Sequence, residues 1–170
     1  MKKSQMIMPE YFDRYIDLVQ EENLFDAFKH SLIVLENLDK EKLISLKGKT
    51  YMEGKWTVNE IFQHITDFER ILSYRTMLFA RGFLQAQMGF DENTIAKCSK
   101  AENRDMTDII DELIAVRTST IALFKTFDTE DYKKTGTNWK YDISVLAMGF
   151  NIIGHQIHHL KIINEKYFCL

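Results

Sequence analysis

The spacing of hydrophobic and polar residues along the chain predicts four helical segments. In each segment apolar side chains return every three or four residues, which places them on one face of an α-helix. The third segment is a clear case, because Ile109, Leu113, Val116 and Phe124 follow this spacing. We predict helices over residues 9–38, 57–82, 105–127 and 142–167, the first of them as a short helix followed by a longer one.

The second helix has the best-defined start. Thr57 and Glu60 are spaced as a capping box, in which the threonine hydroxyl and the glutamate carboxylate each accept a hydrogen bond from a backbone N–H. Trp56 and Ile61 flank this cap at the spacing of a hydrophobic staple. Gly82 is placed to end the helix, because glycine readily adopts the left-handed conformation found there.

The last helix differs because apolar residues occupy nearly its whole circumference. Met148 and Ile152 lie on one side of it, and Phe150 and Ile153 lie on the other. A helix that is apolar all round is buried on more than one side. We therefore expect this helix to pack inside the bundle and also against a second copy of the chain, which predicts a homodimer.

A long connection separates the second and third predicted helices. Residues 83–104 lack strong periodicity and exceed the ~2–8 residues that usually join neighbouring helices of a bundle. Such a connection allows two successive helices to run parallel. The chain has 170 residues and no repeat, low-complexity tract or flexible linker. The pattern predicts an all-α fold, a single domain over residues 1–170 built as a four-helix bundle with one long crossover connection between helices two and three.

Composition and charge exclude several classes of protein. Hydrophobic residues make up 45% of the chain and aromatic residues 12%, which excludes intrinsic disorder. Seven glycines and one proline are too few for the many tight turns of a β-sandwich or barrel. The formal net charge is −3, and no stretch forms the basic stripe that a DNA-binding surface needs. We therefore expect a globular protein that binds no nucleic acid.

The remaining features predict a soluble, cytoplasmic protein. The longest nearly apolar run, residues 143–154, falls short of the ~20 residues that cross a bilayer, so we expect no membrane association. The first residues contain no apolar stretch long enough for a signal peptide. Cys98 and Cys169 lie far apart and form no Cys-x-x-Cys pair. This spacing argues against a disulfide framework or a thiolate metal site and fits a reducing compartment.

Two histidines in the last helix are spaced to bind one metal ion. His155 and His159 are four residues apart, which places their Cβ atoms ~5–6 Å from each other on one helix face. Two imidazoles so placed can bind one cation, as in the His-Glu-x-x-His zinc proteases. Gln156 stands where those proteases have their general base, so the chain is not one of them. The alternative is a pair of buried histidines that hydrogen-bond to carbonyl groups.

His64 is the best candidate for a third ligand. It lies at the edge of the apolar face of the second helix, between Glu60 and Asp67. The alternative for His64 is a hydrogen bond to Asp67 without any metal. We predict that His30 lies at the surface, and that His158 is either exposed or placed behind a ligand.

Six short motifs occur in a characteristic order along nearly the whole chain, roughly residues 9–168. They are Lys55–Val58, His64–Arg70, Tyr74–Arg75, Gly89–Glu92, Glu112–Arg117 and Gly154–His159. Each motif alone is common, but in this order they are specific. Together they resemble the motifs of the DinB-like (YfiT-like) superfamily.

The resemblance implies a four-helix bundle with one crossover that forms a dimer. It also implies a divalent metal ion, commonly zinc or nickel, held by His64, His155 and His159. Better-understood members use a low-molecular-weight thiol such as bacillithiol or mycothiol in S-transfer or isomerisation, and others are classed as metal-dependent hydrolases. The resemblance therefore implies a metal-dependent enzyme for a small-molecule substrate, with a low-molecular-weight thiol as cosubstrate in the transferase case.

Three histidine ligands leave a coordination position open, which is typical of a catalytic metal site. We hypothesise that the metal activates either a thiol, in an S-transferase, or a water, in a hydrolase. Asp67 is the candidate to orient the His64 imidazole, and its alternative is a solvated carboxylate. Arg75 is the candidate to bind an anionic substrate, and its alternative is a salt bridge within the bundle. The competing hypothesis is a non-catalytic dimeric bundle with a structural metal or none.

Overall fold

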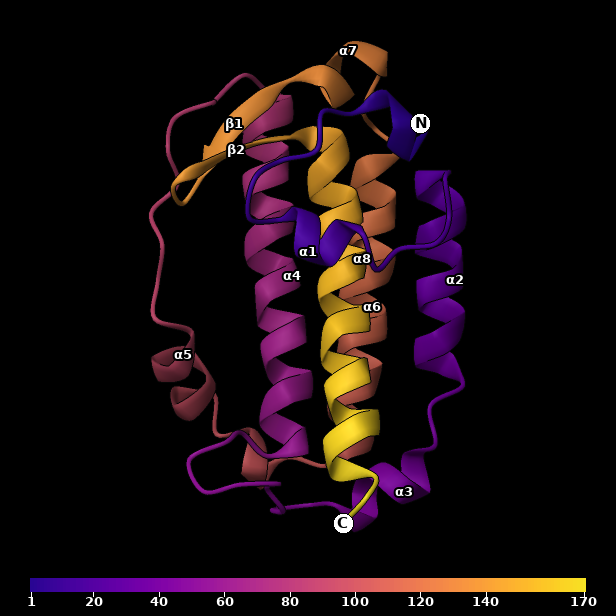
Figure 1. The fold of residues 1–170 in the computed structure, drawn as a ribbon, viewed down its shortest axis with the longest axis vertical. Coiled ribbons are helices and arrows are strands. Elements are labelled where there is room, and N and C mark those ends of the chain that lie inside the picture. The colour runs from indigo at the N-terminus through magenta and orange to yellow at the C-terminus, as the bar shows by residue number, and fades with distance from the viewer.

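Four long helices lie side by side in the computed structural model, which describes residues 1–170 (Figure 1). They are α2 (Leu24–Glu36), α4 (Val58–Ala80), α6 (Met106–Phe124) and α8 (Val145–Ile162). Each lies within one predicted segment, and a short helix, α1 (Asp13–Ile16), precedes α2 as expected. A π-helical turn, Ile163–Tyr167, continues α8. None of the helices combines the length and the hydrophobicity that a bilayer span requires.

Helices α4 and α6 run in the same direction. The contacts between them show this, because residue numbers rise in the same order on both helices: Glu69 pairs with Arg117, and Ser73, further along α4, pairs with Thr120, further along α6. The connection after α4 returns along the outside of the bundle, past α5 (Glu92–Cys98) and the 3₁₀ turn Ala101–Asn103 (Figure 1). Helix α6 therefore begins near the start of α4. Helix α8 runs the opposite way, which brings its C-terminal half beside the N-terminal half of α4.

The predicted capping box is present at the start of α4. The Thr57 hydroxyl accepts a hydrogen bond from the Glu60 backbone N–H, and the Glu60 carboxylate accepts one from the Thr57 N–H at 2.7 Å. At the other end Arg81 is the C-cap, and Gly82 has φ +91°, a conformation that residues with a side chain rarely adopt. Local sequence signals therefore set both ends of the helix that carries His64.

Three short helices and one β-hairpin have no counterpart in the hydrophobic pattern. They are α3 (Lys40–Ser45), α5, α7 (Thr129–Lys133) and an antiparallel hairpin of β1 (Thr135–Asn138) and β2 (Tyr141–Ser144). The helices are too short to show a helical period. The hairpin turn is Trp139–Lys140, without the glycine or asparagine that usually marks such a turn, and Trp139 has φ +60°. The bundle is thus capped by a small hairpin that hydrophobic periodicity does not indicate.

Helix α8 is buried along most of its length within a single chain. Every residue from Val145 to Gln156 is buried. Helices α1, α2 and α4 pack around α8, and α7 and β2 cover its N-terminal end. Contacts within one chain therefore account for the apolar circumference of this helix, and the homodimer through it stays a prediction.

A buried ion pair connects the four long helices. Arg117 of α6 donates to both carboxylate oxygens of Glu69 on α4, each at 2.9 Å, and the two side chains are 0% and 2% exposed. Arg117 also donates to the hydroxyl of Ser31 on α2. Gln156 of α8 donates to the Ser31 carbonyl oxygen at 3.1 Å. This network neutralises the charge of Arg117 and fixes the positions of the helices that carry the histidines.

Candidate metal centre

Three histidines from α4 and α8 meet inside the bundle. His64 comes from α4, and His155 and His159 come from consecutive turns of α8. Nε2 of His155 lies 3.2 Å from Nε2 of His64 and 3.1 Å from Nε2 of His159. The structure therefore brings together the three residues predicted as metal ligands, although His64 and His155 are 91 positions apart in the sequence.

The separation of the three ring nitrogens fits a divalent cation. Two imidazole nitrogens bound to a tetrahedral zinc ion at ~2.05 Å lie about 3.3 Å from each other. The ligand atoms of all three histidines lie within 4.8 Å of one another, and the two shorter separations are close to the expected value. Imidazole is a good ligand for both zinc and nickel. Donor type and spacing therefore fit either metal.

Burial keeps the three imidazoles neutral. The exposed fractions of His64, His155 and His159 are only 4%, 4% and 9%. Burial lowers the pKa of His64 to about 4 and that of His159 to about 2. Burial and the neighbouring histidines also hold the pKa of His155 well below its usual range. Neutral imidazole is the form that binds a metal, so the cluster is ready to bind one at neutral pH.

Aromatic rings surround the three imidazoles. The ring centroid of Trp56 lies 4.7 Å from that of His64, and Phe68 stacks on His155 at 4.3 Å. Tyr15, which precedes the last residue of α1, meets the ring of His155 edge-on at 5.4 Å. These apolar rings restrict the imidazoles and limit access of water. Phe68 follows His64 at helical spacing, whereas the position of Tyr15 depends on how α1 packs on α8 and has no sequence signal.

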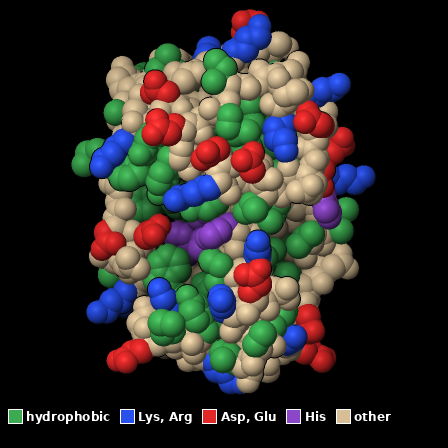
Figure 2. Space-filling view, viewed as in Figure 1, with side chains coloured by type: hydrophobic (Ala, Val, Ile, Leu, Met, Phe, Trp, Pro, Cys, Tyr) green, Lys and Arg blue, Asp and Glu red, His purple; other side chains and the backbone are tan.

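Two cavities lie near the cluster. One cavity, of about 230 Å³, is lined by His159 and Trp56 among others. The other, of about 310 Å³, has Phe68 and Arg75 among its lining residues. Asn93 of α5 lines both. Figure 2 shows histidine side chains at the bottom of a hollow in this face of the molecule. A small molecule can therefore approach the cluster from the surface.

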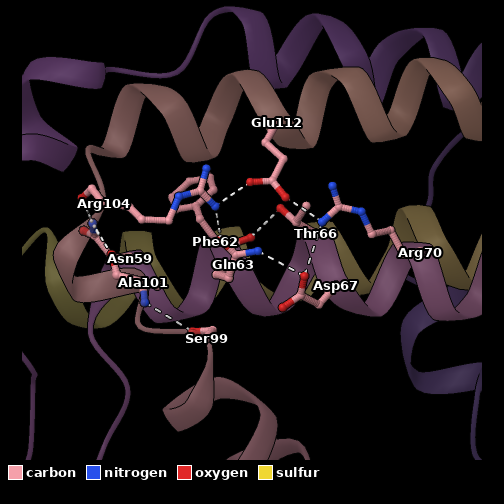
Figure 3. A network of polar contacts seen from close by, with 10 residues as sticks. All are labelled: Asn59, Phe62, Gln63, Thr66, Asp67, Arg70, Ser99, Ala101, Arg104 and Glu112. Carbon is pink, nitrogen blue, oxygen red and sulfur yellow. Dashed lines mark hydrogen bonds and ion pairs between the residues drawn. The ribbon is translucent and has the colours of Figure 1, made fainter.

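Asp67 belongs to a different network from the histidines. Its carboxylate accepts hydrogen bonds from Gln63 at 3.0 Å and from Arg70 at 3.4 Å. Arg70 and Arg104 both pair with Glu112 of α6, and Arg104 also donates to Gln63 (Figure 3). Asp67 makes no hydrogen bond to His64 in this arrangement. The predicted role of Asp67 in orienting that imidazole has no contact that supports it.

Arg75 lies beside the second cavity and joins three elements. It is 7% exposed, and its guanidinium donates to the Met88 carbonyl oxygen at 2.6 Å and to the Asn138 side-chain oxygen. Met88 belongs to the crossover connection and Asn138 to β1, so Arg75 holds both against α4. No salt bridge forms at Arg75, so the alternative of an ion pair within the bundle is not supported. Its predicted contact with an anionic substrate stays a prediction.

The other two histidines lie outside the cluster. His30 is exposed, as expected, and pairs with the carboxylate of Glu21. His158 is partly exposed, and its ring lies 5.3 Å from that of Tyr15. Burial, followed by the charge of Arg14, lowers the pKa of His158.

Comparisons with known proteins give two matches. A family model described as the DinB superfamily matches residues 23–163. The solved structure of YfiT from Bacillus subtilis superposes with a TM-score of 0.66 and 21% sequence identity, covering 97% of this chain and 90% of that chain. YfiT is described as a probable metal-dependent hydrolase with an unusual four-helix bundle topology. No curated protein sequence matches the chain significantly.

Proposed function

Because the chain belongs to the DinB superfamily and joins three buried histidines at one point, we propose that it is a metal-dependent enzyme that hydrolyses a small molecule. The observation that carries this proposal is the convergence of three neutral imidazoles beside two cavities. The likeness of its fold to YfiT, with the description that YfiT carries, is consistent with it.

His64, His155 and His159 would hold the metal ion, which we propose to be zinc or nickel. Catalytic zinc sites typically have three protein ligands and keep one position for water or substrate, whereas structural sites have four. When bound, the ion would supply Lewis-acid activation of a nucleophile. The number of ligands therefore favours a catalytic over a structural role.

Other side chains prepare the site for such a reaction. Trp56, Phe68 and Tyr15 shield the imidazoles from bulk water, and electrostatic interactions are stronger in a site with little water. Asn93 lines both cavities and offers an amide group to a bound substrate. The chain thus provides an apolar enclosure with a few polar groups, which is typical of a small-molecule site.

One observation favours a second candidate, transfer of a low-molecular-weight thiol. The cavity that His159 lines has no aspartate or glutamate in its wall. In hydrolases a carboxylate within reach of the attacking water often takes its proton. A thiol, with a pKa near 8.5, loses its proton far more easily than water. An S-transferase would therefore need such a carboxylate less.

Metal content is the first test of the proposal. We expect stoichiometric zinc or nickel in protein purified without a histidine tag, and loss of that metal in His64→Ala, His155→Ala and His159→Ala. The matched control is His30→Ala, because His30 is exposed and lies outside the cluster. Wild-type protein without stoichiometric metal would contradict the proposal.

Activity assays distinguish the remaining alternatives. Metal-loaded protein would be incubated with a panel of esters, amides and other electrophiles, with and without bacillithiol or mycothiol. Turnover without thiol supports a hydrolase, and turnover only with thiol supports an S-transferase. If removal of the metal lowers stability and no turnover is found in either series, the protein is a non-catalytic bundle with a structural metal.

A further inference from the structure

The chain buries two arginines that differ in how their charge is compensated. Arg117 donates to both carboxylate oxygens of Glu69. Arg75 is 7% exposed and forms no salt bridge; it donates only to neutral oxygens of Met88 and Asn138. Burial lowers the pKa of Arg75, which reflects the cost of keeping the cation away from water. A buried cation without a counter-ion is unfavourable, so an anion at this position would be stabilising.

Arg75 lines the cavity that lies beside the metal centre. This cavity, of about 310 Å³, also has Phe68 in its wall, and the ring of Phe68 stacks on that of His155. Arg75 follows His64 on α4 by about three turns, or about 16 Å along the helix axis. Side chains of a helix lean towards its N-terminus, which directs Arg75 back towards the histidines. The cavity therefore extends from a buried cation to Phe68, the ring that packs on the metal centre.

Aromatic residues form much of the cavity wall. Tyr11 and Trp139 line it, with their ring centroids 5.4 Å apart. Both have positive φ, +70° and +60°, which is rare for bulky side chains and is shared by only one other non-glycine residue, Lys100. Strained backbone of this kind often occurs at ligand sites. The wall suits a flat apolar group, because such a group can stack on aromatic rings.

We propose that this cavity binds a small monocarboxylate with an aromatic or otherwise flat apolar body, and that Arg75 binds the carboxylate. Arginine binds carboxylates through two parallel N–H···O bonds, and Arg75 has N–H groups left beyond those that reach Met88 and Asn138. The bound carboxylate is the counter-ion that Arg75 lacks. That this ligand is the substrate of the metal centre rests on the proposed function.

The charges around the cavity favour a ligand with a single negative charge. Arg75 is the only lysine or arginine that lines it. Asp91 and Glu92 lie at its exposed rim and would repel a second negative charge, as in a phosphate or a dicarboxylate. The volume is near the lower end of the ~300–1,000 Å³ of typical ligand pockets, so the ligand is small.

A matched pair of probes tests this inference by titration calorimetry. 3-Phenylpropionate and 3-phenylpropionamide have nearly the same shape, but only the first is charged. We expect the wild-type protein to bind the carboxylate about ten- to a hundredfold more tightly than the amide. Arg75→Gln should lose this preference, and Arg75→Lys should keep part of it. Equal affinity for the two probes in the wild type would overturn the inference, as would an unchanged preference in Arg75→Gln.

Control variants separate recognition of the carboxylate from effects on folding. Arg81→Gln removes an exposed arginine at the end of the same helix and should leave the preference unchanged. If Arg75→Gln does not fold, the NMR signal of the Arg75 Nε–H in the wild-type protein provides the test instead. It should shift on titration with the carboxylate and not with the amide, and no shift with either probe would overturn the inference.

Metal-free and metal-loaded proteins are titrated in parallel, so that failure of this inference can be told from failure of the proposed function. The proposed carboxylate site contains none of the three histidines, and we expect binding in both forms. Protein that holds metal but shows no preference for the carboxylate overturns this inference and leaves the proposed function standing. Protein that prefers the carboxylate but holds no metal overturns the proposed function and leaves the carboxylate site standing.

Discussion

The backbone carbonyl of Tyr15 packs directly against Gly154. A Cβ atom added at Gly154 would lie 2.0 Å from the Tyr15 carbonyl oxygen and 2.4 Å from its carbon. Helix α1 can therefore lie against α8 only because residue 154 has no side chain. This contact places the Tyr15 ring beside His155, the residue that follows Gly154. The glycine thus positions one wall of the candidate metal centre.

We expect Gly154→Ala to lower the free energy of unfolding by about 1–3 kcal/mol, the usual cost of overpacking. The matched control is Gly149→Ala on the same helix. There the atoms nearest to an added Cβ are side-chain ends, 2.8 Å away on Leu24 and Phe124, which can move more easily than backbone. Both variants gain the same helix propensity from alanine. The difference between their free energies of unfolding, measured by urea denaturation, therefore reports the contact with Tyr15. Equal stability of the two variants would show that the Tyr15 carbonyl opposes a Cβ atom no more than the movable side chains at Gly149 do.

The contacts of Asp67 lead to a prediction about metal affinity. Asp67 hydrogen-bonds to Gln63 and Arg70 and not to a clustered histidine. We therefore expect Asp67→Asn to change the dissociation constant of zinc by less than about threefold, whereas loss of a residue that orients a ligand typically costs 10–100-fold. Competition with a chromophoric chelator measures this constant. A loss of about tenfold or more would show that Asp67 does orient His64.

Local patterns in the sequence predict much of the fold. Thr57, Glu60 and Gly82 predict both ends of α4, because capping depends on residues within one turn. Helical spacing alone places His155 and His159 on one face of α8. That His64 meets them depends on the alignment of two helices that are distant in the chain. The position of His64 at the edge of its helix face made it the best candidate but left a hydrogen bond to Asp67 equally open, and the family resemblance then implied the ligand role.

Features that depend on packing between distant segments could not be predicted. The contact of Tyr15 with Gly154 joins two segments far apart in the sequence, and neither residue type indicates it. The hairpin turn at Trp139 lacks the usual turn residues. Arg75 has no charged neighbour at helical spacing that would indicate Met88 and Asn138 as its partners. The cavity lined by Phe68 and Arg75 could therefore be recognised only in the folded structure.

The buried pair of Glu69 and Arg117 predicts a large effect on stability. Glu69→Ala would leave the charge of Arg117 buried without a partner, and we expect it to cost about 3–5 kcal/mol in the free energy of unfolding. The control is Arg70→Ala, whose partly exposed pair with Glu112 is expected to contribute about 0–1 kcal/mol.

A double variant shows whether the cost of Glu69→Ala comes from the unpaired charge. Glu69→Leu combined with Arg117→Met replaces the pair by apolar groups of similar size, so we expect it to be more stable than Glu69→Ala. Urea denaturation measures all three variants. If the double variant is the least stable of them, the ion pair itself, and not the unpaired charge, is what the fold requires.

The buried histidines predict that the metal-free protein loses stability as the pH falls below 6.5. An unperturbed histidine has a pKa near 6.5, whereas burial lowers the pKa of His64 to about 4 and that of His159 to about 2. Between these values the unfolded chain binds protons that the folded chain does not, so acid favours unfolding. Each such histidine adds a slope of up to ~1.4 kcal/mol per pH unit.

The window from pH 5 to pH 6.5 isolates this effect from that of the carboxylates. Burial raises the pKa of the Glu112 carboxyl, but hydrogen bonds from Arg70 and Arg104 outweigh burial and hold this pKa below its ordinary value of 4.5. The stability that ionised Glu112 contributes is therefore lost only at pH values below that window. We expect urea denaturation of chelator-treated protein to show the slope, His64→Ala to reduce it, and His30→Ala to leave it unchanged. A stability that stays constant from pH 6.5 to pH 5 would mean that the clustered imidazoles take up protons in the folded state, and they would then compete poorly for a metal ion.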